Sequence, residues 1–169
     1  RVEGRVGDDI HFAGVNVLVS EHARITGERT DLLALALSVE IMPDALLPGD
    51  LLAYGYQVEI NGAVGGDVDF GGESLIIRGR VGGRVDASVG DWRRDTDLPG
   101  LPVYNVSFND PGLAVADDAF IGGDLSYEAP SRRPIPPGVV QGRISYDAVI
   151  SQPDITNLGE TDSAARLLR

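Results

Sequence analysis

A repeated segment constrains the fold of this chain more than any other feature of its sequence. The segment VGGDVDFGG at residues 64–72 recurs 17 residues later as VGGRVDASV at residues 81–89. Related segments extend the series in both directions and give eight units, which begin at residues 6, 25, 47, 64, 81, 102, 121 and 140. A unit of this length is too short to bury a core alone, so the units must stack on one another.

The aligned units place apolar residues in two shared columns. The first column consists of Ile10, Leu32, Leu51, Val68, Val85, Val106, Leu125 and Ile144. The second column, two residues further on, consists of Phe12, Ala34, Ala53, Phe70, Ala87, Phe108, Tyr127 and Tyr146. Alternating pairs such as Leu75 and Ile77 follow later in the units. Alternation with a period of two is typical of a β-strand that buries one face.

Short strands separated by Gly-rich turns at a near-constant spacing predict a β-solenoid. We expect an all-β, single-domain, right-handed parallel β-helix of about eight coils, with 17–22 residues per coil. The β-helix should span residues 1–150 with an insertion at 92–103, and residues 151–169 should form a tail or a linker to a further segment. Coils stacked about 4.8 Å apart would give a rod about 38 Å long.

Other folds explain parts of the pattern. A helix over residues 32–37 is favoured by the propensities of Leu and Ala, and a β-sandwich also contains many short strands. Neither predicts the same residue types in the same columns at a near-constant spacing. A left-handed β-helix repeats an aliphatic residue every six positions, which this sequence does not sustain. A right-handed β-helix is therefore the favoured prediction.

Charge and composition narrow the possible functions. The net charge is −12, which argues against nucleic-acid binding. All 14 basic residues are Arg, so Lys-dependent chemistry is excluded, and the absence of Cys excludes thiolate nucleophiles and Cys metal sites. No run of 18 apolar residues occurs. The chain begins without Met and ends in SAARLLR, so we expect a fragment of a longer protein.

Two stretches resemble the bactofilin, or polymer-forming cytoskeletal, family. VEINGAVGGDV at residues 58–68 and LIIRGRVGGRV at residues 75–85 match the family's repeated pattern of Val and Gly, and residues 119–127 resemble its bacterial envelope relatives. The resemblance covers roughly residues 4–90 and 113–146. The insertion at 92–103 and the 22-residue second unit depart from the family's regular coils.

This resemblance implies a non-catalytic structural scaffold that associates with itself through its terminal coils. It also implies a place in the bacterial cell envelope, membrane-associated and extracytoplasmic, with the membrane contact made by segments outside this sequence. A cytoplasmic cytoskeleton is the alternative location. The alternative function is a carbohydrate-binding or carbohydrate-cleaving parallel β-helix.

One polar column stands directly before the first apolar column. It consists of Asp9, Asp31, Asp50, Asp67, Arg84, Asn105, Asp124 and Arg143. Stacked carboxylates could bind Ca²⁺, with Asp31, Asp50 and Asp67 as ligands, or act on a carbohydrate. The favoured interpretation is that the Asp side chains cap backbone N–H groups of the turns. We expect no other cofactor and no catalytic residue.

Several apolar residues are candidates for partner contacts. Leu33 and Leu52 follow a buried position and should face outward, unless the insertion covers them. Trp92 begins the insertion. Val6, Ile10 and Phe12 should lie at an open N-terminal edge, whereas the Pro-rich residues 132–137 should guard the C-terminal end. We therefore expect a monomer or a dimer joined through two N-terminal ends.

Overall fold

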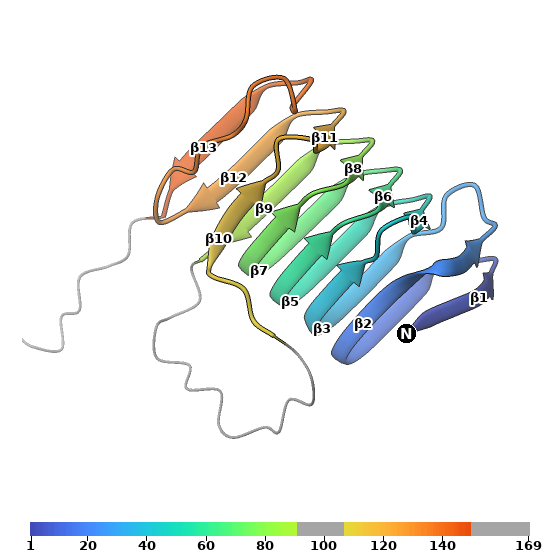
Figure 1. The fold of residues 1–169 in the computed structure, drawn as a ribbon. Helices are drawn as coiled ribbons and strands as arrows, with labels where there is room; N and C mark the ends of the chain where they lie inside the picture. The colour runs from blue at the N-terminus through green and yellow to red at the C-terminus, as the bar shows by residue number, and fades with distance from the viewer. Residues whose placement is uncertain (91–106, 150–169) are drawn as a thin grey trace, which may run out of the picture.

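The computed structural model describes residues 1–90 and 107–149, which form a right-handed parallel β-helix of seven coils (Figure 1). This confirms the predicted fold class. The strands are β1 (Val2–Val6), β2 (Ile10–Ile25), β3 (Leu32–Ile41), β4 (Leu46–Leu47), β5 (Leu51–Ile60), β6 (Ala63–Val64), β7 (Val68–Ile77), β8 (Arg80–Val81), β9 (Val85–Val89), β10 (Gly112–Val115), β11 (Phe120–Ile121), β12 (Leu125–Ala129) and β13 (Ile144–Ala148). In these residues no helix has the length and apolarity needed to cross a membrane.

A complete coil has three sides, as β5 and β6 illustrate. The first half of β5 forms the first side, its second half forms the second side, and β6 forms the third. The strand bends at Gly55, where an added Cβ would collide with the carbonyl oxygen of Ala36 in the coil below. We number the coils 1 to 7 by their first-side strands, which are β2, β3, β5, β7, β9, β12 and β13. All neighbouring coils pair in parallel, in one nine-stranded and one four-stranded sheet.

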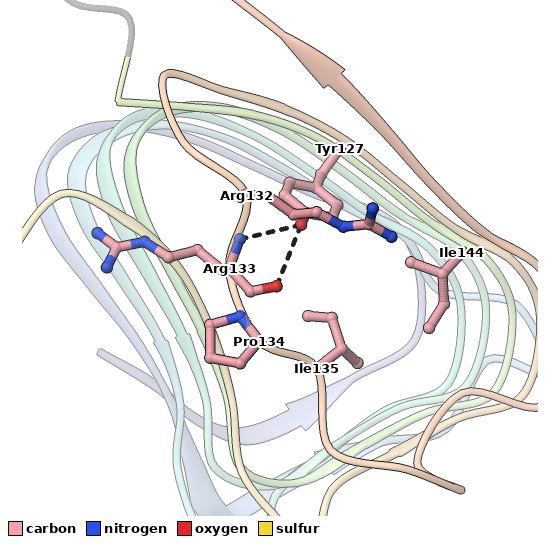
Figure 2. A pocket seen from close by; sticks show the side chains of 6 residues that line it. All are labelled: Tyr127, Arg132, Arg133, Pro134, Ile135 and Ile144. Carbon is pink, nitrogen blue, oxygen red and sulfur yellow. Dashed lines mark hydrogen bonds between the residues drawn. The ribbon is translucent and has the colours of Figure 1, made fainter.

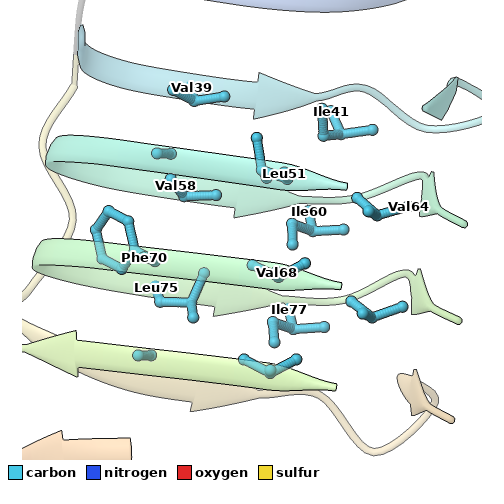
Figure 3. Packing of buried hydrophobic residues seen from close by; sticks show 14 of the residues in the cluster. Val39, Ile41, Leu51, Val58, Ile60, Val64, Val68, Phe70, Leu75 and Ile77 are labelled. Carbon is cyan, nitrogen blue, oxygen red and sulfur yellow. The ribbon is translucent and has the colours of Figure 1, made fainter. Parts of the chain in front are cut away.

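The predicted columns form the core. Leu51, Val68 and Val85 are directly paired neighbours, as the alignment of the units requires. Val68 and Phe70 on the first half of β7 face Leu75 and Ile77 on its second half (Figure 3). None of these four side chains is more than 4% exposed. The hydrophobic driving force therefore acts along continuous columns parallel to the rod axis.

The number of coils differs from the expected eight. The unit predicted to begin at residue 102 is not a separate coil, because Val85 in β9 pairs directly with Leu125 in β12. Instead, β10 pairs with β7 and completes the second side of the coil that β9 begins. Phe108, predicted to be buried, is 39% exposed, and Val106 lies outside the described residues. A gap of 40 residues fits two short coils or one interrupted coil equally well, so spacing alone could not distinguish them.

The two ends of the rod differ. At the N-terminal end, β1 pairs with residues 19–25 of β2, whereas residues 10–14 pair only with β3 in the described part of the chain. At the C-terminal end, β13 pairs only with β12 in that same part of the chain. Residues 130–137 occupy the second side of coil 6 without forming a strand. Proline explains this irregularity, because Pro lacks the N–H that a ladder needs and four stand within these residues.

Candidate functional site

The Asp column forms a ladder of hydrogen bonds along the rod. In each case one carboxylate oxygen accepts the backbone N–H of the equivalent residue in the next coil. The N···Oδ1 distances are 3.0 Å from Asp31 to Asp9, 2.8 Å from Asp50 to Asp31, 2.7 Å from Asp67 to Asp50, 2.9 Å from Arg84 to Asp67, and 2.7 Å from Arg143 to Asp124. These bonds confirm the turn-capping interpretation.

Charge compensation along this column is uneven. The Arg84 guanidinium lies 3.1 Å from Asp67, 3.5 Å from Asp69 and 3.7 Å from Asp86, so it serves three carboxylates of coils 4 and 5. Among the described residues, Asp31 and Asp50 form no ion pair. Within the part of the chain that the structure describes, the edge of coils 2 and 3 therefore carries negative charge that no ion pair compensates.

Calcium binding by Asp31, Asp50 and Asp67 stays a prediction. Within residues 1–90 and 107–149, no three His, Asp or Glu side chains are grouped so as to hold a metal ion. One oxygen of each predicted ligand is already engaged by a backbone N–H. The carbohydrate-directed role of the column also stays a prediction, and Asn105 lies outside the described residues.

Leu33 and Leu52 are neighbours on the outer face of the first side. They pair across β3 and β5, and the next outward pair along the same strands is Leu35 and Tyr54. Leu35 and Tyr54 are 54% and 53% exposed, and Leu52 is 37% exposed. Our sequence reasoning missed Leu35 and Tyr54, although the period-two alternation that identified Leu33 also places them outward.

A shallow cavity brings two predicted sets of residues together. Its volume is about 290 Å³, and its lining includes Asp31 and Asp50 from the Asp column with Leu33 and Leu52 from the outer face. Asp67, the third predicted calcium ligand, is not among the lining residues. The candidate site of this protein is therefore an apolar surface with an acidic border, which no single motif in the sequence specified.

The remaining predicted contact residues lie elsewhere. Val6, Ile10 and Phe12 are half-buried rather than fully exposed, and Val6 accepts the N–H of Thr26 at 2.8 Å. The strand β1 therefore covers part of the edge that we predicted to be open. Trp92 lies outside the described residues.

A second cavity, of about 470 Å³, lies at the C-terminal end of the rod (Figure 2). Tyr127, Ile135 and Ile144 line it together with residues 132–134. The Tyr127 hydroxyl accepts the N–H of Arg133 at 3.2 Å and donates to its carbonyl oxygen at 3.3 Å, which ties the Pro-rich segment to the coil. Ile144 is 41% exposed beside this cavity.

Polar contacts hold residues 107–109, which follow the insertion and which we name its return segment, against the corner of coil 3. Gln57 donates to the carbonyl oxygen of Ser107 at 2.9 Å and accepts the backbone N–H of Asn109 at 2.9 Å. The Phe108 ring packs against Tyr56 with centroids 4.5 Å apart. Burial, followed by the nearby carboxylates of Glu73 and Asp110, raises the pKa of Tyr56.

Comparison with known proteins adds no relative. No family model matches the chain, and no curated protein or solved structure is significantly similar to it.

Proposed function

We propose that this chain is a non-catalytic structural scaffold, a short β-helical rod that associates with a second copy through its N-terminal end. The bactofilin resemblance implies such a role, in a bacterial cell envelope or, alternatively, in a cytoskeleton. The observation that carries the proposal is the first side of coil 1, where residues 10–14 have a paired strand on one side only within the described chain.

An unpaired strand edge favours addition of another strand, because its N–H and C=O groups have no protein partner. Pro and charged residues oppose such addition, and the chain has no Pro before Pro43. The ends differ in the second side, since Pro130, Pro134, Pro136 and Pro137 stand in the second side of coil 6. Pairing between two identical N-terminal ends is closed by a two-fold axis and produces a dimer rather than a filament.

The test compares one substitution at each end of the same column. Ile10 and Ile144 are the first and last residues of the first apolar column in the described chain. We expect Ile10→Lys to convert the dimer into a monomer and Ile144→Lys to leave the dimer unchanged. Light scattering coupled to gel filtration measures the mass, and thermal unfolding verifies that both variants remain folded.

A wild-type chain that stays monomeric at all concentrations would contradict this proposal. Long filaments that Ile144→Lys disrupts would also contradict it, because they would show that the C-terminal end takes part in assembly.

A further inference from the structure

The outer face of the first side changes character along the rod. In coils 2 and 3 its outward residues are Leu33, Leu35, Leu52 and Tyr54, which we name the Leu–Tyr patch. The equivalent residues of the later coils are Asp69 and Gly71, Asp86 and Ser88, Ser126 and Glu128, and Ser145 and Asp147. The equivalent residues of coil 1 are His11 and Ala13, so the patch is confined to coils 2 and 3 of the first side.

The patch is exposed rather than covered by its neighbours. Leu35 and Tyr54 are each more than half exposed. The Tyr54 ring extends over Gly71 of coil 4, where an added Cβ would lie only 2.9 Å from the ring. Val15, which is 48% exposed in coil 1, adds another apolar group near the corner. Contiguous exposed apolar side chains of this kind mark surfaces that bind a partner.

The border of the patch is acidic. Asp31 and Asp50 stand immediately before the buried residues of these two coils and line the 290 Å³ cavity beside Leu33 and Leu52. Neither carboxylate forms an ion pair among the described residues, whereas Arg84 compensates the equivalent region of coils 4 and 5. Asp31 and Asp50, unpaired within residues 1–90 and 107–149, thus border the apolar patch.

We propose that the Leu–Tyr patch docks an amphipathic segment of a partner protein, with apolar side chains over Leu33, Leu35, Leu52 and Tyr54 and Arg or Lys side chains opposite Asp31 and Asp50. Complementary charge supports a basic partner and opposes a second copy at this surface, because two patches placed face to face would bring their acidic borders together. The proposal is independent of association through the N-terminal end, since it concerns a different surface.

The test uses a fluorescent synthetic peptide about four helical turns long, with Leu at positions i, i+3, i+4 and i+7 and Arg beside them. Fluorescence anisotropy measures its binding to the full chain. We expect Leu52→Ser combined with Tyr54→Ser, named the patch variant, to weaken binding at least about tenfold, because central apolar contacts dominate such interfaces. Asp31→Asn combined with Asp50→Asn should weaken it about threefold to tenfold and reduce its salt dependence.

Matched controls separate docking from general attraction to an acidic chain. Ser126→Ala combined with Glu128→Gln alters the equivalent positions of coil 6 and should leave binding unchanged. A peptide of the same composition in scrambled order should bind at least about tenfold more weakly, since its apolar face is lost. Three outcomes would overturn the proposal. The scrambled peptide binds as tightly as the designed peptide, the patch variant binds the designed peptide as tightly as the wild type does, or the wild type does not bind the designed peptide.

Two further measurements distinguish other occupants of the patch. The patch variant should unfold at the same temperature as the wild type, because exposed side chains contribute little to stability. A clear fall in its melting temperature would mean that the chain's own residues cover the patch, and would overturn the proposal. If the wild type is a dimer, and the patch variant is a monomer while Ile10→Lys stays dimeric, the patch binds a second copy of this chain. That result would also overturn the proposal.

Discussion

Val68 in the middle of the rod and Ile144 in its last coil occupy the same column, but their environments differ. Val68 is fully buried between paired neighbours in β5 and β9, whereas Ile144 is 41% exposed and, within the described chain, pairs only with Leu125. Phe70 and Tyr146 show the same contrast in the second column, since Phe70 is buried and Tyr146 is half-buried. The burial of a residue in a solenoid depends on the coils on either side of it. The same motif therefore contributes differently to stability in the middle of the rod and at its end.

The second side of the coils extends this contrast. In coil 4 it is a regular strand that pairs with both β5 and β10. In coil 6 the equivalent residues form no strand, and the Tyr127 hydroxyl holds them through the backbone of Arg133. The middle of the rod is therefore stabilised by repetition, and its C-terminal end by particular side-chain contacts.

The largest effect is expected from a charge placed in the first column. Val68→Asp should lower the free energy of unfolding by about 3–5 kcal/mol or prevent folding, because the carboxylate would be buried without a partner. Ile144→Asp should cost less than about 1 kcal/mol, since that side chain reaches solvent. Urea unfolding measures both, and equal losses would show that burial does not differ between the two coils.

A glycine at the corner of the middle coils should be the next most sensitive position. Gly55→Ala should cost at least about 2 kcal/mol, because its Cβ would collide with the backbone of Ala36. Gly138→Ala in coil 6 meets nothing within 4 Å and should cost about 1 kcal/mol, from its positive φ of 84° alone. Thermal unfolding compares the two, and a greater loss at Gly138 would contradict the packing argument.

The Asp ladder should respond to loss of an acceptor more than to loss of charge. Asp50→Ala removes the acceptor of the Asp67 N–H and should cost about 1 kcal/mol, whereas Asp50→Asn keeps an acceptor oxygen and should be nearly neutral. Asp124→Ala should cost less than Asp50→Ala, because only one described coil follows it. Urea unfolding of the three variants decides this, and equal effects of Ala and Asn at Asp50 would refute the capping role.

The same variants test the calcium hypothesis. We expect Ca²⁺ at millimolar concentration to leave the melting temperature unchanged relative to NaCl of equal ionic strength. A rise that Asp50→Asn abolishes would instead support a Ca²⁺ site in the column, because a ligand that binds only the folded state stabilises it.

The smallest change in stability that we expect from a substitution concerns Tyr56, at the corner of coil 3. Burial raises its pKa above the usual value of 10.0, so the folded state retains the phenol proton where the unfolded state has begun to lose it. The stabilisation from this group is therefore complete below pH 10 and is lost as the pH rises through the higher folded-state pKa. The melting temperature of Tyr56→Phe should fall less than that of the wild type above pH 10. Parallel curves for the two proteins would contradict this assignment.

The periodic pattern predicted most of the core and part of the candidate site. Leu51, Val68, Val85 and Leu125 were assigned to one column, and the structure pairs them as neighbours. The pattern also placed Leu33 and Leu52 outward. The pattern wrongly placed Phe108 in the core. Phe108 lies in the return segment, and its ring packs against Tyr56 instead.

The sequence by itself determined which side chains of the regular strands face inward, because alternation along a strand and its repetition from unit to unit can both be read from residue order. Only the tertiary structure decided that the rod has seven coils, since the pairing of Val85 with Leu125 joins residues 40 positions apart. It also decided that Asp31 and Asp50 border the same cavity as Leu33 and Leu52 while Arg84 compensates the next coils. Such juxtapositions depend on how separate coils stack and how their side chains reach across them, which no spacing within a single unit specifies.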